Sequence, residues 1–402
     1  MVTNQSPQVW SNDDQFRQHV REFLRDALTG EFAALQGLGG PGREHESHDE
    51  RVKWDRYLAE HGWTGIGWPV EHGGRGLSLW QQVIFHEEYA LADAPARVNH
   101  LGEELLGPTL IAFGTPEQQK RFLPSILAVE ELWCQGYSEP GAGSDLANVS
   151  TKATLTDDQG TAEWVIDGQK VWTSQAHQAD WCFVVARTEP GSVRHKGLSY
   201  LLVPMHQPGV EVRPIVQLTG TSEFNEVFFS GARTDADLVV GAPGEGWAVA
   251  MGTLGFERGV STIGQQVGFR RELDHLITLA KDTGAWDDLV LRDRLRHAEV
   301  ELEVIRLNAL RMLADASTHS DSGSGQASIT KLLWGTWHRT LGDLAMAVQG
   351  AAALTCGPDY DLSDWQRLFL FTRADTIYGG SNEVQRNILS ERVLGLPREA
   401  RA

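Results

Sequence analysis

A glycine- and hydroxyl-rich stretch, CQGYSEPGAGSDLA (residues 134–147), holds residue types that can bind a polar ligand. Gly141 and Gly143 free the backbone beside Ser144, while Ser138 and Ser144 supply hydroxyl groups. Exposed backbone N–H groups and short hydroxyls make a good seat for a polar heterocycle or a phosphate. Turns of this composition are common without any ligand, so this stretch alone favours an ordinary turn.

A second candidate group lies in GQKVWTSQAHQADW (168–181). Trp172, at the end of a predicted strand, can place its indole against a flat ring, and the hydroxyls of Thr173 and Ser174 can reach the edge of that ring. Taken alone, Trp172 is better explained as a half-buried strand residue.

The chain closes on DTIYGGSNEVQRNIL (375–389), which predicts a loop that runs into a helix. Tyr378, Gly379 and Gly380 predict a tight turn with few side chains. Ser381 is placed to cap the helix that follows.

Metal and hydrolase chemistry have weak support. His45 and His48 form an HxxH pair, but the surrounding REHESHDE is charged, so a solvated loop is the better interpretation. We therefore predict no metal site. No GxSxG and no GxGxxG after a strand occurs in the sequence.

The elements that must position these residues begin with helices. Residues 1–130 have helical patterns, and Ser11 is placed to cap a helix that runs to Leu28. GTPEQQKRFLPSIL starts another helix, with Thr115 as N-cap and Gln118 completing a capping box. We expect an N-terminal helical domain.

Strand signals dominate residues 131–243, in segments such as AEWVIDGQKVW and LSYLLVPM. Asp167-Gly168 predicts a two-residue hairpin turn. The spacing of glycines and prolines suits a compact β-barrel or sandwich, so we expect a middle β-domain here.

The helical period returns over residues 244–402. Long helical patterns suit a C-terminal four-helix bundle, and HSDSGSGQAS (319–328) predicts a short flexible connection. The predicted fold class is α+β, with helical, β and helical domains in that order. The helical patterns cover 244–282, 288–318, 325–355 and 381–394.

Composition narrows the class of protein. Hydrophobic residues make up 41% and charged residues 22%, as in ordinary globular proteins. The net charge of −19 argues against nucleic acid or an anionic membrane as partner. No apolar run is long enough to span a membrane, and the N-terminus lacks the features of a signal peptide. Three scattered cysteines draw no disulfide framework, so we expect a cytoplasmic protein.

Taken together, the motifs resemble the acyl-CoA dehydrogenase family over nearly the whole chain. YSEPGAGSDL, GQKVWTS, FNEVFFSGART, GEGWAVAMGTLGFERG and YGGSNEVQRNIL occur in the order found in that family. The resemblance implies three domains, usually in a tetramer, with FAD bound between the β-domain and the C-terminal helices. It also implies that the flavin accepts hydride from the β-carbon of an acyl-CoA thioester, a glutamate removes the α-proton, and an electron-transfer flavoprotein accepts the electrons.

The resemblance assigns roles to individual residues. Ser144 and Arg258 match positions on the side of the acyl-CoA substrate, and Ser381 and Glu383 match positions near the phosphate and adenosine end of the cofactor. Six residues match positions that face the flavin ring: Gln135, Tyr137, Ser138, Trp172, Thr173 and Ser174.

The family places its catalytic glutamate at one of two positions. In medium- and short-chain members it follows the tyrosine of the terminal loop, where this chain has Gly379. In the isovaleryl and long-chain branches it precedes an arginine on a C-terminal helix, and GFERG here supplies Glu257 and Arg258. The resemblance therefore implies Glu257 as the base, with the backbone N–H of Gly379 facing the thioester oxygen.

Helical spacing places small residues on the same face as Glu257. They can leave room for a ligand, or they can serve close helix packing while Glu257 pairs with an arginine from elsewhere. The helix alone favours packing, whereas the side-chain-free Gly379 and the resemblance favour a base. The small residues are Gly246, Ala250, Thr253, Ser261 and Gly264.

Two departures affect the adenylate half of the cofactor site. An arginine motif that reaches the FAD of a neighbouring subunit in many members is absent, since Arg270 and Arg271 are expected inside a helix. QGAAA retains Gln349, the residue matched to the cofactor, but replaces the usual glycines by Ala352 and Ala353. The chain therefore binds FAD differently, or pairs with a second dehydrogenase subunit in a mixed tetramer of the kind that acts on bulky or steroid side-chain acyl-CoAs.

Alternatives of other classes stay open at this point. A flavin monooxygenase or oxidase shares the fold but does not dehydrogenate thioesters. A non-catalytic partner subunit would keep the fold without the base. A DNA-binding relative is disfavoured by the net charge of −19.

Overall fold

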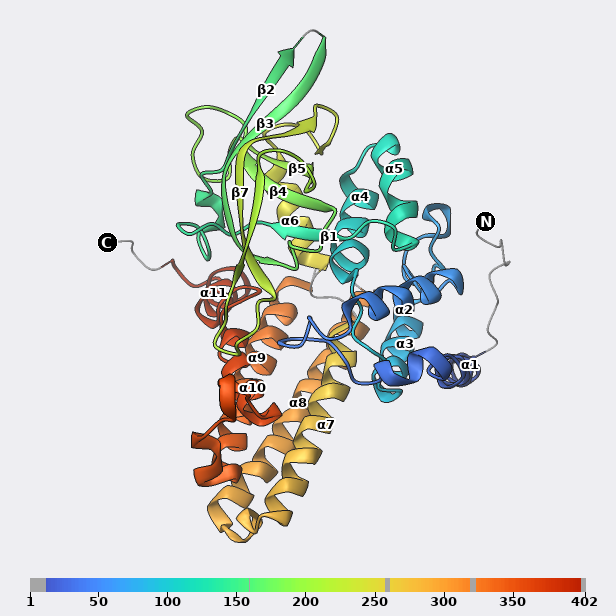
Figure 1. Cartoon of the computed structure of the whole chain (residues 1–402), viewed down its shortest axis with the longest axis vertical. Coiled ribbons are helices and arrows are strands. Elements are labelled where there is room, and N and C mark those ends of the chain that lie inside the picture. The colour runs from blue at the N-terminus through green and yellow to red at the C-terminus, as the bar shows by residue number, and fades with distance from the viewer. Residues whose placement is uncertain (1–11, 159, 257–260, 319–322, 399–402) are drawn as a thin grey trace.

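The computed structural model describes residues 12–158, 160–256, 261–318 and 323–398. Helices, a sheet and helices again follow one another along the chain, which confirms the predicted fold class. Figure 1 shows the sheet at one end of the molecule, the long C-terminal helices at the other and the N-terminal helices beside both.

The N-terminal helices form around aromatic residues. Phe16 and Trp54 are fully buried there, and Trp63 stacks on Phe85. Asn12 caps the first helix, because its side chain accepts from the Gln15 N–H, so the prediction of Ser11 as the cap is wrong. The helices are α1 Asp13–Ala27, α2 His48–Glu60, α3 Leu79–Leu91, α4 Gly107–Phe113 and α5 Pro116–Leu127.

The capping box predicted for α5 is confirmed. The Gln118 N–H donates to the Thr115 hydroxyl, and the Gln118 side chain accepts from the Thr115 N–H. The Gln118 amide also donates to the carbonyls of Asp237 and Val239. The start of α5 is therefore fixed against the sheet domain.

The middle of the chain folds into an open, strongly bent sheet rather than a closed barrel. Its strands pair in the order β6-β7-β3-β2-β4-β5-β8, and β1 pairs β4 in parallel. A single pair of residues, Lys152 and Arg187, joins β2 to β4, so the two halves face each other across a shared core, as in a sandwich. The strands are β1 Trp133–Gly136, β2 Lys152–Asp158, β3 Thr161–Ser174, β4 Trp181–Arg187, β5 Leu198–Pro204, β6 Val210–Ile215, β7 Phe224–Asp235 and β8 Val239–Val240.

The hairpin turn predicted at Asp167-Gly168 is wrong, because β3 runs straight through these residues. They form an irregularity in the pairing with β7, where the Asp167 side chain accepts from the Gly231 N–H. A Cβ on Gly168 would lie 2.5 Å from Thr151 Oγ1. The glycine is required for close approach of two strands rather than for a turn.

The C-terminal part is built from long helices, as predicted. The expected connection over 319–328 is partly helical, since α9 already begins at Gly323, and residues 319–322 lie outside the described ranges. The helices are α6 Gly246–Phe256, α7 Ser261–Asp282, α8 Leu289–Thr318, α9 Gly323–Gln349, α10 Asp364–Phe371 and α11 Asn382–Ile388.

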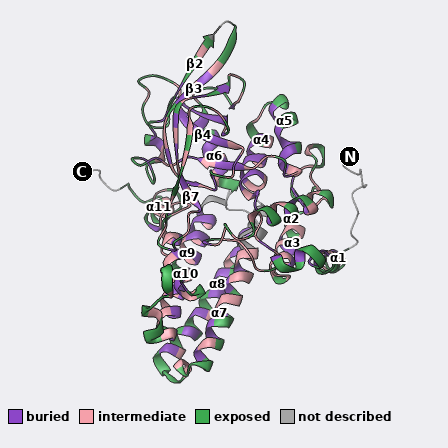
Figure 2. Cartoon of the chain, in the orientation of Figure 1, coloured by how far each residue is buried: buried purple, intermediate pink, exposed green. Residues whose placement is uncertain are grey.

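Contacts between the three parts hold them at fixed positions. The Arg271 guanidinium on α7 donates to the Ala90 carbonyl at the end of α3 and pairs with Asp93 just beyond it. The loop between β6 and β7 reaches the C-terminal part, where the Tyr360 hydroxyl donates to the Leu218 carbonyl. Figure 2 shows buried residues running through the sheet and along the inner sides of α7, α8 and α9. Within the described ranges, no helix combines the length and apolar character needed to cross a membrane.

Candidate functional site

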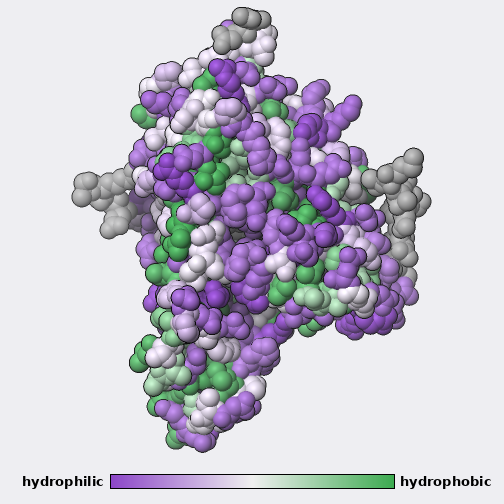
Figure 3. All heavy atoms as spheres, viewed as in Figure 1, coloured by the Kyte–Doolittle hydropathy of each residue, from purple (hydrophilic) through white to green (hydrophobic). Residues whose placement is uncertain are grey.

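A cavity of about 1200 Å³ lies between the N-terminal helices and the C-terminal bundle. Its walls come from residues 37–44, from α3 and the segment after it, from α7, α9 and α10, and from the turn at Tyr378 and Gly379. Apolar residues such as Phe269 and Trp334 line it beside charged ones such as Arg97 and Glu104. Figure 3 likewise shows a mainly hydrophilic face with scattered apolar residues. The cavity is large enough for an organic substrate.

The terminal turn forms one wall of this cavity. Gly379 and Gly380 have φ of +62° and +86°, a region that favours glycine. The side-chain amide of Gln385 donates to both of their carbonyls. Ser381 caps α11 as predicted, since its hydroxyl accepts from the Val384 N–H. The turn thus brings backbone, and no carboxylate, to the cavity at Gly379.

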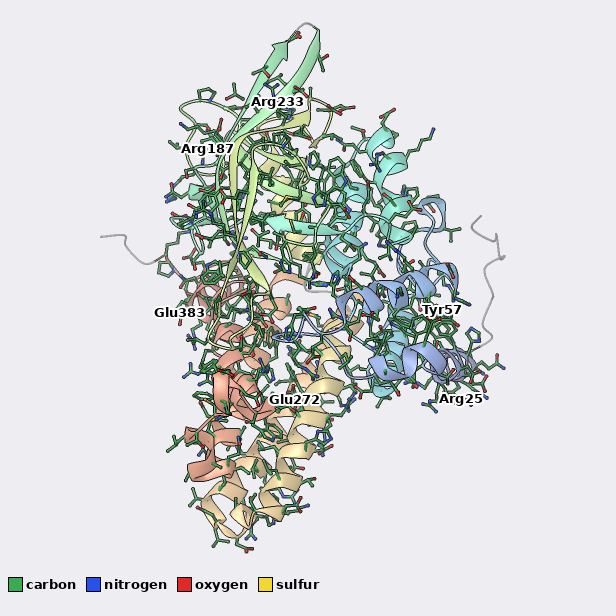
Figure 4. The ribbon with its side chains drawn as sticks, in the orientation of Figure 1. Arg25, Tyr57, Arg187, Arg233, Glu272 and Glu383 are labelled. Carbon is green, nitrogen blue, oxygen red and sulfur yellow. The ribbon has the colours of Figure 1, made fainter. Side chains whose placement is uncertain are left out.

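A buried histidine lies behind this turn. His338 on α9 has Nδ1 2.6 Å from Asp375 Oδ2 and Nε2 2.9 Å from Glu272 Oε2. Burial lowers the pKa of His338, but the charge of Glu272 and the hydrogen bonds to both carboxylates raise it to about 9. The Tyr378 hydroxyl donates to the other oxygen of Asp375 at 2.6 Å. Figure 4 labels Glu272 near the end of the bundle that faces the rest of the molecule.

Sequence reasoning missed this histidine. The available signal is a polar residue among buried apolar ones on α9, where Trp334, Trp337 and Leu341 surround its position. A buried histidine of this kind is usually satisfied by a neighbour, but its partners come from two other segments of the chain. The sequence pattern alone does not identify them.

A buried ion pair fixes the backbone of the loop at residues 134–147. Lys170 on β3 donates to the Tyr137 carbonyl, to Glu139 Oε1 and to the Val185 carbonyl, at 3.0, 2.9 and 2.7 Å. Burial raises the pKa of Glu139, but the charge of Lys170 and hydrogen bonds including one from the Ser150 N–H lower it to about 2. All three donors of the ammonium are satisfied, so the pair fixes the backbone of Tyr137. Neither Lys170 nor Glu139 was among the predicted site residues.

Trp172 has an unusual backbone and an exposed side chain. Its φ is +61°, at a register shift in the pairing of β3 with β7 between Lys170 and Thr173. A non-glycine residue in this region is strained, and such strain concentrates at functional sites. The Trp172 side chain remains 58% exposed and touches Phe224 edge to face. The bulge turns the indole outward, so the half-buried strand position does not describe this residue.

Two of the predicted site residues each hold a buried polar atom without a hydrogen-bond partner among the described residues. These atoms are Nε2 of Gln135 and Oγ1 of Thr173. Buried polar atoms are normally paired, so these two are free to bind a polar ligand. Gln135 and Thr173 were both predicted to face a ring.

Glu44 connects the cavity to the segment that follows Trp172 (residues 172–175). Burial raises the pKa of the Glu44 carboxyl, opposed by the charges of His100 and Arg51 and by a hydrogen bond with Gln175. Glu44 lines the cavity, and Gln175 directly follows Ser174. Glu44 itself is therefore packed into the molecule, whereas His45 and Ser47 beside it are exposed, and the segment runs into α2 at His48.

Other predicted residues lie apart from this region or at its edge. Ser144 is exposed on its loop, and Gln349 is the last residue of α9, with its amide donating to the Ala345 carbonyl of the same helix. Glu383 is exposed in the first turn of α11, at the outer edge of the molecule in Figure 4. Hydrogen bonds from its own backbone N–H and from Ser381 lower the pKa of Glu383. Glu257 and Arg258 lie outside the described residues.

The small residues predicted to leave space beside Glu257 mostly serve packing. A Cβ on Gly246 would lie 2.4 Å from the Ser199 carbonyl carbon, and Ala250 is fully buried. Thr253 is also fully buried, with its hydroxyl 2.8 Å from that of Thr109 on α4. Gly264, on α7, does line the cavity. The face of α6 that carries Gly246, Ala250 and Thr253 is therefore packed, whereas Gly255 and Phe256 at its end are exposed.

Both arginines predicted to lie in a helix do so. Arg270 and Arg271 are part of α7, where Arg270 pairs with Asp274 and Arg271 pairs with Asp93. Their guanidinium groups are thus engaged in contacts within the chain.

Models of the three domains of one protein family match the chain in succession. The acyl-CoA dehydrogenase N-terminal domain matches residues 11–130, the middle domain residues 134–232 and the C-terminal domain residues 244–394. Among curated proteins, the chain is 64% identical over 388 residues to acyl-CoA dehydrogenase IpdE1 of Mycobacterium tuberculosis, covering 96% of this chain and 99% of the relative. IpdE1 of Mycolicibacterium smegmatis is also 64% identical, over 96% of this chain and 98% of the relative.

Solved structures show the same fold. A structure titled Tcur3481-Tcur3483 steroid ACAD is 28% identical, with a TM-score of 0.82 over 98% of this chain and 100% of that chain. The ChsE4-ChsE5 complex from Mycobacterium tuberculosis is also 28% identical, with a TM-score of 0.76 over 98% and 100% of the two chains. Both titles name an assembly of two proteins.

Proposed function

Because this chain belongs to the acyl-CoA dehydrogenase family, we propose that it converts an acyl-CoA thioester to the 2-enoyl-CoA with FAD as cofactor. The observation that carries the proposal is the 1200 Å³ cavity, which is lined by the Gly379 turn and by Glu44, whose side chain hydrogen-bonds Gln175 just beyond Trp172–Ser174. When bound, FAD supplies the acceptor for the hydride that leaves the β-carbon. Passage of the electrons to an electron-transfer flavoprotein and a cytoplasmic location are part of the proposal.

The residues beside Trp172 fit a flavin ring. Trp172 presents an exposed indole on a strained backbone, and Gln135 and Thr173 hold buried polar atoms without partners among the described residues. An aromatic face next to unpaired donors and acceptors is what a flat polar heterocycle requires. We assign these three residues, with Tyr137, Ser138 and Ser174, to the flavin. Gln349, Ser381 and Glu383 are assigned to its adenylate end.

Removal of the α-proton requires a carboxylate in a site shielded from water, with donors aimed at the thioester oxygen. Gly379 has no carboxylate, and the two carboxylates behind the turn, Glu272 and Asp375, both hydrogen-bond His338. We assign the base to Glu257, which follows the end of α6 and precedes the part of α7 that lines the cavity. The Gly379 N–H is assigned to the thioester oxygen, and Ser144 and Arg258 to the substrate.

Exchange of the α-proton tests this assignment separately from electron transfer. In deuterated buffer, the enzyme with FAD and its subunits complete is expected to exchange deuterium into the α-position of a saturated acyl-CoA analogue that cannot lose hydride from its β-position. Glu257→Gln should abolish the exchange, because an amide cannot accept the proton. Gly379→Ala should keep measurable exchange, because it leaves the base in place. Equal exchange rates in Glu257→Gln and the unmodified enzyme would remove Glu257 from this role.

Two observations favour a mixed oligomer, in which this chain assembles with a second, different subunit. Two structural neighbours bear the names of two-protein assemblies, and Ala352 lies exposed just beyond α9. We propose that a different dehydrogenase chain completes the FAD site in a mixed tetramer that acts on bulky or steroid side-chain acyl-CoAs. This arrangement predicts that the chain purified alone retains much less than one FAD per polypeptide. One FAD per polypeptide without a partner would show that a homo-oligomer suffices.

Two rival functions make different predictions. A flavin monooxygenase or oxidase would consume oxygen without reduction of the flavin by an acyl-CoA. A non-catalytic partner subunit would leave the turnover of the reconstituted complex unchanged by Glu257→Gln. The cavity, its contact with the Gly379 turn and the family membership favour the dehydrogenase.

A further inference from the structure

A chain of hydrogen bonds behind the terminal turn has no part in the reaction proposed above. It runs from Glu272 on α7 to His338 on α9, then to Asp375, and ends at the Tyr378 hydroxyl. The three contacts measure 2.9, 2.6 and 2.6 Å. The next residue after Tyr378 is Gly379, which lines the cavity. This series of hydrogen bonds therefore joins two long helices, α7 and α9, to the turn.

The geometry requires a proton on each nitrogen of the His338 ring. Both nitrogens face carboxylate oxygens, and an ionised carboxylate can only accept hydrogen bonds. The ring is 9% exposed, and its centroid lies 4.3 Å from that of Phe269. The pKa of about 9 agrees with this arrangement, because two nearby carboxylates favour the charged ring.

We propose that His338 and Asp375 are positioning residues for the Gly379 turn. The doubly protonated ring holds Asp375 in the orientation in which its second oxygen anchors Tyr378, and Tyr378 in turn fixes the backbone of Gly379. The effect on the turn stands on the structure itself. Its effect on catalysis rests on the proposed function, in which the Gly379 N–H meets the thioester oxygen.

Loss of one proton from the His338 ring breaks this series of hydrogen bonds. A neutral imidazole can donate to Glu272 or to Asp375, but not to both, so one carboxylate then faces a lone pair. The other charged groups nearby have different partners: Arg271 on α7 pairs with Asp93, and Lys331 on α9 donates to the Asp375 carbonyl. Asp364 and Arg367 on α10 and His275 on α7 also line the cavity. Glu272 and Asp375 are the carboxylates in hydrogen-bond contact with the ring.

The same series of hydrogen bonds also connects the turn to whatever occupies the cavity. The Glu272 side chain is 36% exposed and lines the cavity, whereas that of Asp375 is 1% exposed. A ligand that carries charge, or that removes water from beside Glu272, alters the electrostatic environment of His338 and thereby the contact of Asp375 with Tyr378. Occupancy of the cavity and order in the turn are therefore coupled through this chain.

Hydrogen exchange of the backbone tests the positioning role without any substrate. In the FAD-loaded enzyme, the peptide that covers residues 375–381 should be protected at about pH 7 and lose about tenfold of that protection near pH 10, after correction for intrinsic exchange. His338→Gln should show the lower protection at both pH values. His297→Gln is the matched control, because His297 lies exposed on α8 beside Glu301 at 3.5 Å. It should behave as the unmodified enzyme does.

The pH dependence of turnover tests the link to catalysis. With the best acyl-CoA of a straight-chain, branched and steroid side-chain series, kcat should fall above a pH near 9, the pKa of His338. Asp375→Asn should lower kcat by about tenfold to a hundredfold with a much smaller change in KM. Glu272→Gln should move the alkaline limb down by about one pH unit, because it removes one negative charge beside the ring. The shift is measured as the pH at which kcat falls to half of its maximum for each variant, so it does not depend on the maximal kcat of that variant.

The outcomes separate this inference from the proposed function. If no acyl-CoA is turned over but exchange at 375–381 follows His338, the proposed function fails and the positioning role of His338 stands. If turnover occurs and both the exchange and the alkaline limb are the same in His338→Gln as in the unmodified enzyme, the positioning role is wrong. Should the variants fail to fold, the unmodified enzyme still decides. Protection of 375–381 that stays constant between pH 7 and pH 10 overturns the inference.

Discussion

At the scale of single residues, Lys170 and Glu139 show what sequence reasoning overlooks. The glycines and serines around residue 140 were predicted to form a ligand seat, yet the loop is held by a lysine from β3 that is completely buried. In the sequence, Lys170 is indistinguishable from an ordinary exposed polar residue of a strand. Its burial follows from the packing of β3 against β1 and β4, which no local pattern reveals.

Removing the lysine should destabilise the protein strongly. Lys170→Met leaves the buried Glu139 carboxylate without its cation, which costs about 3–5 kcal/mol in the free energy of unfolding. Lys152→Met on the exposed side of β2 is the control and should change it by less than about 1 kcal/mol. Denaturant unfolding of the two variants checks this. Equal stability of the two would show that the pair does not hold the loop.

The same pair predicts a dependence on acid. The pKa of Glu139 is about 2 in the folded protein, below its ordinary value of 4.5, so the carboxylate stabilises the fold above pH 4.5. That contribution is lost as pH falls from about 4.5 toward about 2. Melting temperatures measured over this range should therefore fall more steeply for the unmodified protein than for Glu139→Gln. Parallel curves would contradict the shift.

At the scale of elements, the sequence predicted most helices and strands because their apolar periods are local. The predicted cap of α5 and the Ser381 cap of α11 were confirmed for the same reason. Asp167-Gly168 was misread because a turn and a close approach of two strands both require glycine, and only the fold distinguishes them. The outward turn of Trp172 depends on a register shift that no single strand pattern shows.

Helix α6 offers a test of packing with two glycines in one element. Gly246→Ala should destabilise the protein by about 1–3 kcal/mol, because the added Cβ would lie 2.4 Å from the Ser199 backbone. Gly255→Ala meets nothing within 4 Å and should stabilise the helix by up to about 1 kcal/mol. Thermal unfolding of both variants measures the difference. A destabilised Gly255→Ala beside a neutral Gly246→Ala would mean that α6 does not pack on the sheet as described.

At the scale of the whole molecule, the cavity arises where parts far apart in sequence meet. The sequence indicated the family, the domain order and the candidate flavin residues, because each lies within a short motif. It did not indicate that residues 37–44 close the cavity, or that Glu272, His338 and Asp375 meet behind the turn. Those contacts depend on the relative placement of α7, α9 and the terminal turn. The domain boundaries at 130 and 243 and the role of Glu257 stay predictions.

The most direct test of the whole account is reduction of the bound flavin without oxygen. The FAD-loaded protein, with its partner subunit where one is required, is mixed anaerobically with straight-chain, branched and steroid side-chain acyl-CoAs. We expect at least one of them to bleach the visible flavin absorption and to yield the 2-enoyl-CoA, and we expect Glu257→Gln with the same FAD content to do neither. Bleaching by Glu257→Gln at the unmodified rate, or a flavin that none of the thioesters reduces, would contradict it.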